Sequence, residues 1–201
     1  MAALRLLLFI DAQNVYNRAR HAFFTNSDSH VCGQIKPIEL GNLICSRSPA
    51  GCIYKLERVR IYTGQPNASK EPKAYGAHRK QSNIWEKSGA EVRARPLRYL
   101  KDWPTSPAQQ KGVDVELAID FITFAIDQAY DIGVIASTDT DLKPALEFVN
   151  RKYHPTIRTE VVAWDSPNTP SRISIAHPFI WCHWLSKTDY DAIADLRDYN
   201  L

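Results

Sequence analysis

The sequence predicts an α/β fold of three layers, in which helices cover both faces of a central, mainly parallel sheet. Short apolar segments typical of buried strands alternate along the chain with longer segments whose apolar residues have helical spacing. The length of 201 residues, with 44% hydrophobic and 23% charged residues, suits one globular domain. We expect that domain to span residues 1–165, with residues 166–201 forming an extension packed on it.

Five segments are expected to form strands, because they are apolar or alternating and are bounded by turn residues. The first and fourth are continuous apolar runs, which is typical of strands buried on both faces of a sheet. The third alternates, and we expect it to be interrupted or to end at Pro96. The expected strands are residues 4–10, 56–62, 91–100, 132–137 and 159–163.

Five further segments are expected to be helical: residues 14–24, 37–45, 78–87, 113–130 and a segment that begins near residue 142. The clearest is the fourth, where apolar residues recur at i, i+3 and i+4. Asp141 is expected to cap the last helix, with Pro144 in its first turn. Residues 64–75 are expected to be a polar loop.

The last 36 residues change in character, with Pro and Ser turns followed by the aromatic stretch FIWCHWL. We expect Phe179, Trp181 and Trp184 to pack in the core, because large aromatic side chains are usually buried. The alternative is that this stretch docks a protein partner or a second copy of the chain.

The sequence shows no targeting signal and no cysteine spacing typical of a metal site. The apolar start of the chain ends at Asp11 without a small-residue cleavage site, and no apolar run approaches the roughly 18 residues of a membrane helix. We therefore expect a cytoplasmic protein. The four cysteines, Cys32, Cys45, Cys52 and Cys182, form no C-x-x-C pair, so reduced structural thiols are expected. A zinc site at Cys182 and His183 is the weaker alternative, because adjacent ligands are poorly spaced for zinc.

Positive charge is concentrated in the middle of the chain. Residues 70–111 hold ten Lys or Arg and four Asp or Glu, a balance of +6, whereas the whole chain carries +3. The remaining residues therefore sum to −3. A basic segment flanked by acidic motifs indicates a polyanionic partner. The alternative is that these basic side chains are simply exposed to solvent and bind no partner.

Carboxylates follow two of the expected strands and begin the clearest helix. Asp11 ends the first strand, Asp139 and Asp141 follow the fourth, and Asp114 lies near the start of the long helix. Each alone is explained by a turn or a helix cap. Binding sites in parallel α/β sheets lie at the carboxyl ends of the strands, however, so Asp11, Asp114 and Asp139 meet in one cleft if the first and fourth strands are neighbours.

Clustered carboxylates favour a hard cation such as Mg²⁺ or Mn²⁺, and the chemistry that such a site supports is phosphodiester hydrolysis. A haloacid-dehalogenase phosphatase is excluded because Gln13 stands where that class needs a second Asp. The chain also has no P-loop, no G-x-G-x-x-G and no G-x-S-x-G motif.

Three motifs in order, FIDAQNVYNRAR, KGVDVELAIDFITFA and GVIASTDTDLKPAL, resemble those of the NYN domain family of PIN-like nucleases. The resemblance runs from about Leu4 to Trp164. It implies a Rossmann-like PIN fold and a metal-dependent ribonuclease, endonucleolytic in type, that acts on RNA with Mg²⁺ or Mn²⁺. The sequence departs from the family pattern at Ala12-Gln13 and at Thr138, where Gly is common, but no carboxylate is lost.

Residue roles follow from the resemblance by position. Asp11, Asp114 and Asp139 would bind the metal, Asp141 would assist them, and Asn14 would orient Asp11 or touch the scissile phosphate. Contacts to RNA would come from the end of the fourth strand, from the loop before the long helix and from the basic segment. The residues expected to make them are Ser137, Thr138, Lys111, Arg93, Arg95, Arg98, Lys101, Arg79 and Lys80. The alternative function is a non-catalytic RNA-binding or regulatory module on the same fold.

Overall fold

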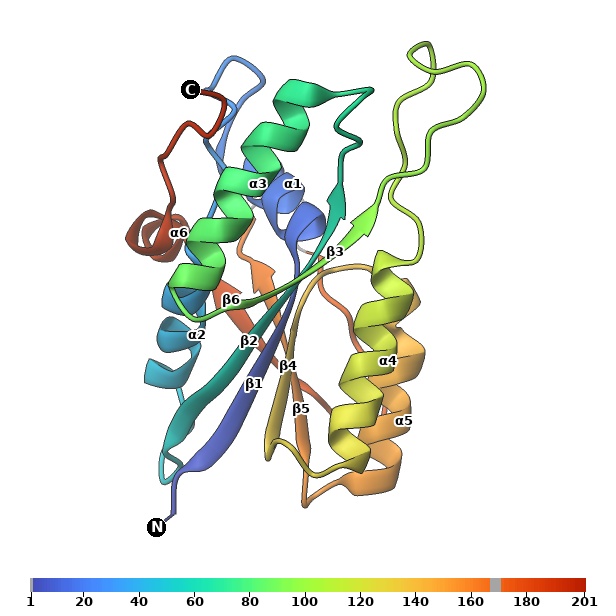
Figure 1. Ribbon diagram of the computed structural model, residues 1–201. Coiled ribbons are helices and arrows are strands. Elements are labelled where there is room, and N and C mark those ends of the chain that lie inside the picture. Colours follow the sequence, from blue (N-terminus) through green and yellow to red (C-terminus); the bar gives the residue numbers. More distant parts are fainter. Residues whose placement is uncertain (1, 167–170) are drawn as a thin grey trace.

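Figure 1 shows the computed structural model, which describes residues 2–166 and 171–201. One sheet of six strands, all parallel, has the order β3-β2-β1-β4-β5-β6. The strands are β1 (Leu4–Asp11), β2 (Tyr54–Gln65), β3 (Glu91–Pro96), β4 (Ile132–Ala136), β5 (Arg158–Trp164) and β6 (Trp181–Leu185). The expected α/β fold with a parallel sheet is confirmed.

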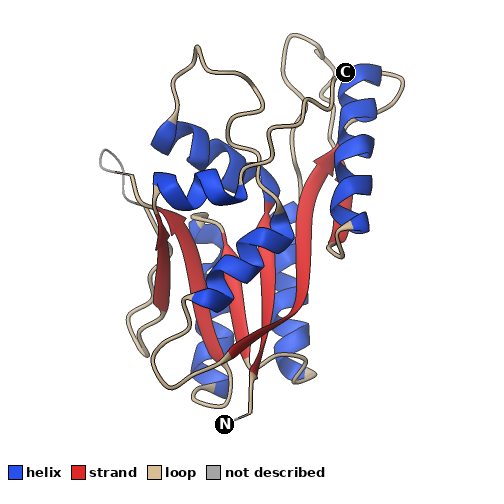
Figure 2. Ribbon diagram, turned by 90° about the vertical axis from the view of Figure 1, so that its left-hand side faces the viewer, coloured by secondary structure: helices blue, strands red, loops and turns tan. Residues whose placement is uncertain are grey.

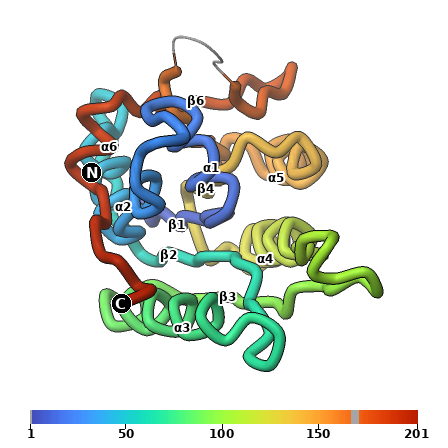
Figure 3. The backbone as a smooth tube through the Cα atoms, turned by 90° about the horizontal axis from the view of Figure 1, so that it is seen from above, coloured from blue at the N-terminus to red at the C-terminus, as the bar shows by residue number. Residues whose placement is uncertain are grey.

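Helices cover both faces of the sheet, as Figures 2 and 3 show. One face carries α1 (Ala12–Phe23), α2 (Pro37–Ser46), α3 (Pro72–Lys87) and α6 (Lys187–Ile193), and the other carries α4 (Val113–Ile126) and α5 (Lys143–Tyr153). The short 3-10 helix η1 (Thr140–Leu142) leads into α5. Among the described residues, no helix combines the length and apolarity needed to cross a bilayer.

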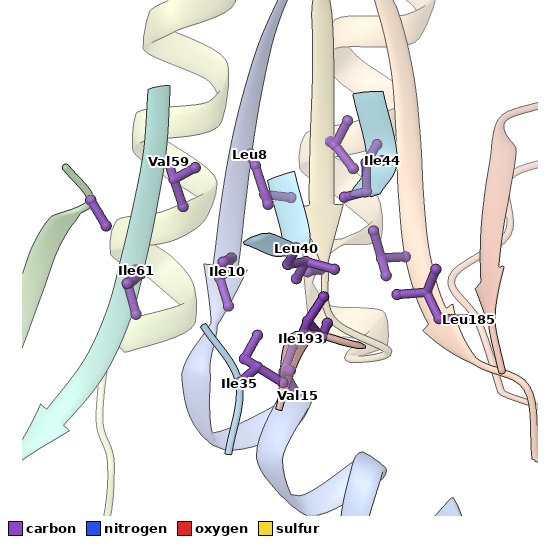
Figure 4. Close-up of a cluster of buried hydrophobic side chains, with 14 of the residues drawn as sticks. Leu8, Ile10, Val15, Ile35, Leu40, Ile44, Val59, Ile61, Leu185 and Ile193 are labelled. Atoms are coloured by element: carbon purple, nitrogen blue, oxygen red, sulfur yellow. The ribbon is translucent and has the colours of Figure 1, made fainter. Parts of the chain in front are cut away.

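Two apolar layers hold the sheet between its helices. Leu8 and Ile10 of β1 point to one face, where they meet Val15 of α1 and Leu40 of α2, as Figure 4 shows. Leu7 and Phe9 point to the other face, toward Phe121 of α4. This alternation buries both faces of β1, which explains its continuous apolar sequence.

Two helix boundaries differ from those expected. The helix expected to start at residue 78 begins at Pro72, so half of the expected loop 64–75 belongs to β2 and α3. Its first turn, Pro72-Lys73-Ala74-Tyr75, was not evident because it shows no apolar periodicity, although proline suits the first helical turn. The helix expected to reach residue 130 ends at Ile126; the backbone N–H of Asp127, not its side chain, makes the C-cap bonds, and Gln128 adopts a positive φ of 51°. The expected end of the third strand at Pro96 is confirmed.

The aromatic segment of the C-terminal residues forms β6, which pairs with β5 at the edge of the same sheet. The expectation that its aromatic side chains are in the core is wrong for two of the three: Phe179 is 64% exposed and Trp181 is 54% exposed. An edge strand has solvent on one side, so large side chains there are not necessarily covered. Cys182 packs on the α5 face, whereas His183 points to the opposite face and contacts Glu160 Oε2 at 2.7 Å. These two residues therefore do not converge on one zinc ion.

Candidate active site

The site lies where the order of strands reverses. From β1 the chain builds outward through β2 and β3, and then returns to place β4 on the other side of β1. Connections that leave the carboxyl ends of two such strands diverge to opposite faces, which opens a crevice between them. Asp11 ends β1, and Ser137 and Thr138 lead from the end of β4 to Asp139.

Three carboxylates from three separate elements border one cavity of about 290 Å³ in this crevice. They are Asp11 from β1, Asp114 from the first turn of α4 and Asp139 from the start of η1. The expected convergence of these acids is therefore observed. The cavity is completed by polar side chains from α1 and from the loop before α4: Gln13, Asn14, Asn17 and Gln110.

Asp11 is buried at the site and fixed by two hydrogen bonds. It is 8% exposed, and its side chain accepts a bond of 3.0 Å from the backbone N–H of Asn14 and one of 3.3 Å from the Ser137 hydroxyl. Burial raises the pKa of its carboxyl, and the charges of Asp139 and Asp114 raise it further, against the opposing effect of the two hydrogen bonds. A carboxyl destabilised in its ionised form by neighbouring carboxylates gains from a nearby cation.

The turn after β4 is bonded to the start of α1. Asn14 Oδ1 accepts from the backbone N–H of Thr138 at 3.0 Å and from its hydroxyl at 3.2 Å. The Ser137 hydroxyl, besides donating to Asp11, accepts from the backbone N–H of Asp139 at 3.1 Å. Ser137 is 2% exposed and Thr138 is 8% exposed, so in this structure the Ser137 hydroxyl holds Asp11 and Asp139, whereas the Thr138 hydroxyl holds Asn14. The Asn14 side chain therefore links the first motif to the third, and its contact with Asp11 is made by its backbone N–H alone.

Asp139, and not Asp141, caps the helical turn that follows. The Asp139 side chain accepts from the backbone N–H of Asp141 at 3.0 Å, and Asp141 itself is exposed. Asp139 can therefore be both a helix cap and a residue of the site, since one of its oxygens faces the turn and the residue also borders the cavity.

Asp114 reaches the cavity because α4 begins immediately before it. Gly112 is the N-cap of α4 and has a φ of 74°, a conformation that glycine adopts without strain. A β-carbon added at Gly112 would also lie 3.6 Å from Arg95 Nε. Lys111, just before it, is exposed and is free to approach an anion from solvent.

Asp120, the second acid of the α4 motif, lies in a different environment. Its Oδ2 accepts from Arg60 Nη2 at 2.8 Å and from the Tyr62 hydroxyl at 2.8 Å. Arg60 is 8% exposed and also contacts Glu91 Oε2 at 2.7 Å. Asp120 therefore joins α4 to β2 and does not face the acidic cavity.

The arginines of β3 lie beside α4. Arg93 Nε contacts Glu116 Oε1 at 3.0 Å, and Arg95 Nη1 contacts Glu116 Oε2 at 3.1 Å. Burial raises the pKa of Glu116, but the bonds from Arg95 and Arg93 more than offset this and hold that pKa below its ordinary value. Both arginine side chains remain 49% exposed, so they present positive charge at the same end of the sheet as the acids.

The remaining basic residues lie further out. Arg98 and Lys101 are exposed in the loop after β3, while Arg79 and Lys80 are exposed on α3. Near them, the ammonium group of Lys70 lies 4.7 Å from the ring centre of Tyr99 and 5.3 Å from that of Trp103. The Tyr99 and Trp103 rings pack edge to face, with their centres 5.6 Å apart, and the Lys70 ammonium group is the cation beside both.

Comparison with known proteins identifies the family. The NYN domain family model matches residues 5–183, which extends past the motifs into β6. The chain belongs to the NYN domain family. A PIN-like nuclease fold is what this membership implies, and the six-stranded parallel sheet agrees with it.

One solved structure resembles this NYN domain along almost its whole length. It is a protein of unknown function from Vibrio parahaemolyticus, 17% identical, with a TM-score of 0.52. The alignment covers 95% of the chain and 90% of the other protein. At this identity the likeness supports the fold alone. No curated protein matches the chain.

The acids of this NYN domain form an open site. Within residues 2–166 and 171–201, no three His, Cys, Asp or Glu side chains are grouped closely enough to bind one ion directly. The donors around the cavity are nonetheless carboxylate and amide oxygens, which are the ligands that Mg²⁺ and Mn²⁺ prefer. Mg²⁺ keeps several waters and is often held by one or two carboxylates, so an open cavity of this size fits a hydrated ion. Sequence motifs did not indicate Gln13, Asn17 and Gln110, because polar amides at these positions have no pattern of their own.

Proposed function

We propose that this NYN domain is a metal-dependent ribonuclease that hydrolyses RNA phosphodiester bonds, endonucleolytic in type. Membership of a nuclease family supports the class of reaction. The observation that carries the proposal is the convergence of Asp11, Asp114 and Asp139 on one open, polar cavity at the carboxyl ends of β1 and β4.

The carboxylates of Asp11, Asp114 and Asp139 would together hold a hydrated Mg²⁺ or Mn²⁺, in part through its waters. When bound, such an ion supplies an activated water and neutralises charge that develops on the phosphate. The raised pKa of Asp11 supports this assignment, because its carboxyl is buried beside two other acids and a cation would favour its ionised form. Asp141 is proposed to assist from the exposed side of Asp139, to which it donates its backbone N–H.

The other residues of the site position these groups and attract the substrate. Asn14 and Ser137 keep Asp11 and Asp139 in place through the bonds described above. Lys111 and the β3 arginines are proposed to meet the RNA backbone close to the acids, with Arg98, Lys101, Arg79 and Lys80 extending the path. If Arg98 and Lys101 contact phosphates, changing each to alanine will weaken RNA binding and lower the salt slope of log K by about one.

The decisive experiment is cleavage of a labelled RNA and a matched DNA in Mn²⁺, in Mg²⁺ and in EDTA. Wild type is compared with Asp139→Asn and with Asp127→Asn, which changes an exposed acid at the end of α4 and serves as the matched control. We expect RNA cleavage that requires metal, is abolished by Asp139→Asn and is retained by Asp127→Asn.

Equal RNA binding by all three proteins, with no cleavage in either metal, would reject the ribonuclease and support the non-catalytic binding module. Asparagine keeps an oxygen that can accept the Asp141 N–H, so loss of folding in Asp139→Asn alone would show that the fold requires the charge of Asp139. Thermal unfolding of each variant, measured alongside cleavage, separates these results.

A further inference from the structure

A second cavity lies on the other side of the first turn of α1. It has a volume of about 350 Å³ and is enclosed by α1, α3, the end of β2 and the C-terminal residues. Figures 1 and 3 both show the C-terminal segment running close to α3. This volume is in the range of about 300–1,000 Å³ that is typical of small-molecule sites.

The lining of this cavity is largely aromatic and apolar, in contrast to the acidic cavity beside it, and its His30 contacts Asp198 Oδ1 at 3.1 Å. Among the described residues, the lining includes no Asp, Glu, Lys or Arg. Tyr16, Trp85 and Tyr199 supply rings, and Gln34 and Gln81, which bond to each other at 3.0 Å, supply amides. An apolar, aromatic cavity with a few neutral polar groups suits a flat heterocycle and not a phosphate.

Two lining residues have buried polar atoms without partners. Trp85 is 7% exposed, yet its Nε1–H has no acceptor within the described part of the chain. Both ring nitrogens of His78 are likewise buried and unpartnered there. Burial lowers the pKa of His78, which favours the neutral ring with one donor and one acceptor nitrogen. Buried polar atoms of this kind are normally satisfied, so a ligand with donors and acceptors would give them partners once the His78 and Trp85 rings shift toward it.

The two cavities are adjacent along one stretch of backbone. Asp11 borders the acidic cavity, Ala12 borders the aromatic cavity, and Gln13 borders both. Because the two cavities share a lining residue at the first turn of α1, a group bound in one lies next to the space of the other.

We propose that the aromatic cavity binds the base of a nucleotide that flanks the phosphate held at the acidic cavity. The inference rests on the proposed function and gives it a substrate requirement: the RNA is single-stranded at this nucleotide, with its base turned away from its neighbours. Unpaired bases are commonly recognised by stacking on aromatic side chains and by hydrogen bonds to their edges.

The test uses single-stranded RNA oligomers that wild type cuts at one mapped bond, with an abasic nucleotide placed on either side of that bond. Cleavage rates are measured with Mn²⁺, and affinities for the same oligomers are measured in EDTA. Ala77→Phe fills the cavity from α3, and Ala77→Ser is its matched control, because serine adds little volume. Trp85→Phe keeps a ring but removes the unpartnered N–H.

For wild type and Ala77→Ser, removing the base on one side is expected to lower cleavage and affinity by about tenfold. Ala77→Phe is expected to treat intact and abasic RNA alike, at the level of the abasic substrate. Trp85→Phe is expected to show a reduced preference for the intact base. Unfolding curves confirm that each variant is folded.

Equal treatment of intact and abasic RNA by wild type, on both sides of the bond and in both measurements, overturns the inference while leaving the nuclease intact. Absence of cleavage in any metal instead removes the proposed function, and the binding data in EDTA still decide whether the cavity takes a base. Unchanged base preference in Ala77→Phe would also overturn the inference, because it would place the base elsewhere.

Discussion

Replacing Asp120 with alanine tests whether the second acid of the α4 motif serves the fold or the chemistry. It lies six residues after Asp114, in the same sequence motif, but its Oδ2 accepts two bonds of 2.8 Å, from Arg60 and from Tyr62. Removing the carboxylate leaves the Tyr62 hydroxyl without its acceptor and leaves Arg60 with Glu91 as its remaining carboxylate. We therefore expect Asp120→Ala to destabilise the protein.

The size of the effect follows from the burial of the pair. A hydrogen bond to a charged group contributes about 1.5–3 kcal/mol, and breaking a fully buried ion pair costs about 3–5 kcal/mol. The Arg60 side chain is 9% exposed and that of Asp120 is 20% exposed, and Arg60 keeps its contact with Glu91, so the loss lies at the low end. We expect the free energy of unfolding to fall by about 3 kcal/mol, which lowers the unfolding temperature by about 6–12 °C in a chain of this length.

Calorimetry or circular dichroism of wild type, Asp120→Ala and Asp127→Ala measures this shift. The Asp127 variant removes an exposed acid from the end of the same helix and is expected to change stability by less than about 0.5 kcal/mol. Cleavage by Asp120→Ala below its unfolding temperature should remain. An unchanged unfolding temperature together with lost cleavage would refute the reasoning and would place Asp120 in the catalytic machinery.

Three further predictions concern stability. Mn²⁺ at 100 times its dissociation constant is expected to stabilise wild type by about 2.7 kcal/mol, which raises the unfolding temperature by about 5–10 °C. The shift is expected to be much smaller for Asp11→Asn. Equal shifts in thermal melts of the two proteins would argue against Asp11 as a ligand. Gly133→Ala is expected to cost about 1–3 kcal/mol in denaturant unfolding, because the added β-carbon would lie 2.5 Å from Tyr130 Cε2; wild-type stability would show that this ring yields freely. The hydrogen bond from Arg5 holds the pKa of Asp131 below 3.8, so the ionised carboxyl stabilises the fold above that pH and this stabilisation is lost as the pH falls through the pKa of the folded state. The free energies of unfolding of wild type and Asp131→Asn, measured from pH 7 to pH 2, should therefore converge. A constant difference would contradict this.

The strands and the acidic site were accessible from sequence because both depend on local patterns. An apolar run that stops at an aspartate fixes the end of a buried strand and the position of a carboxylate together, as in β1. Once the strands are taken to be parallel, their carboxyl ends lie at one edge of the sheet, so Asp11 and Asp139 were expected near each other.

Features that depend on tertiary contacts were not accessible. The bond between Asp120 and Arg60 depends on how α4 lies across β2, which spacing within α4 does not reveal. Trp181 is exposed because β6 is an edge strand, and hydrophobicity alone does not distinguish edge from centre. The aromatic cavity brings together Tyr16, Trp85 and Tyr199, which are too far apart in sequence to form a motif.

The strand order divides the sheet into two halves that are consecutive along the chain. The first three strands along the chain form one half of the sheet and the last three form the other, and the single covalent link between the halves is the segment from β3 to α4. Asp11 belongs to the first half, whereas Asp114 and Asp139 belong to the second. A chain cut between residues 97 and 112 would therefore place an incomplete set of acids on each fragment. Under the proposed function, we expect such fragments to be inactive apart and to cleave RNA only when a fused pair of binding partners brings β1 back against β4.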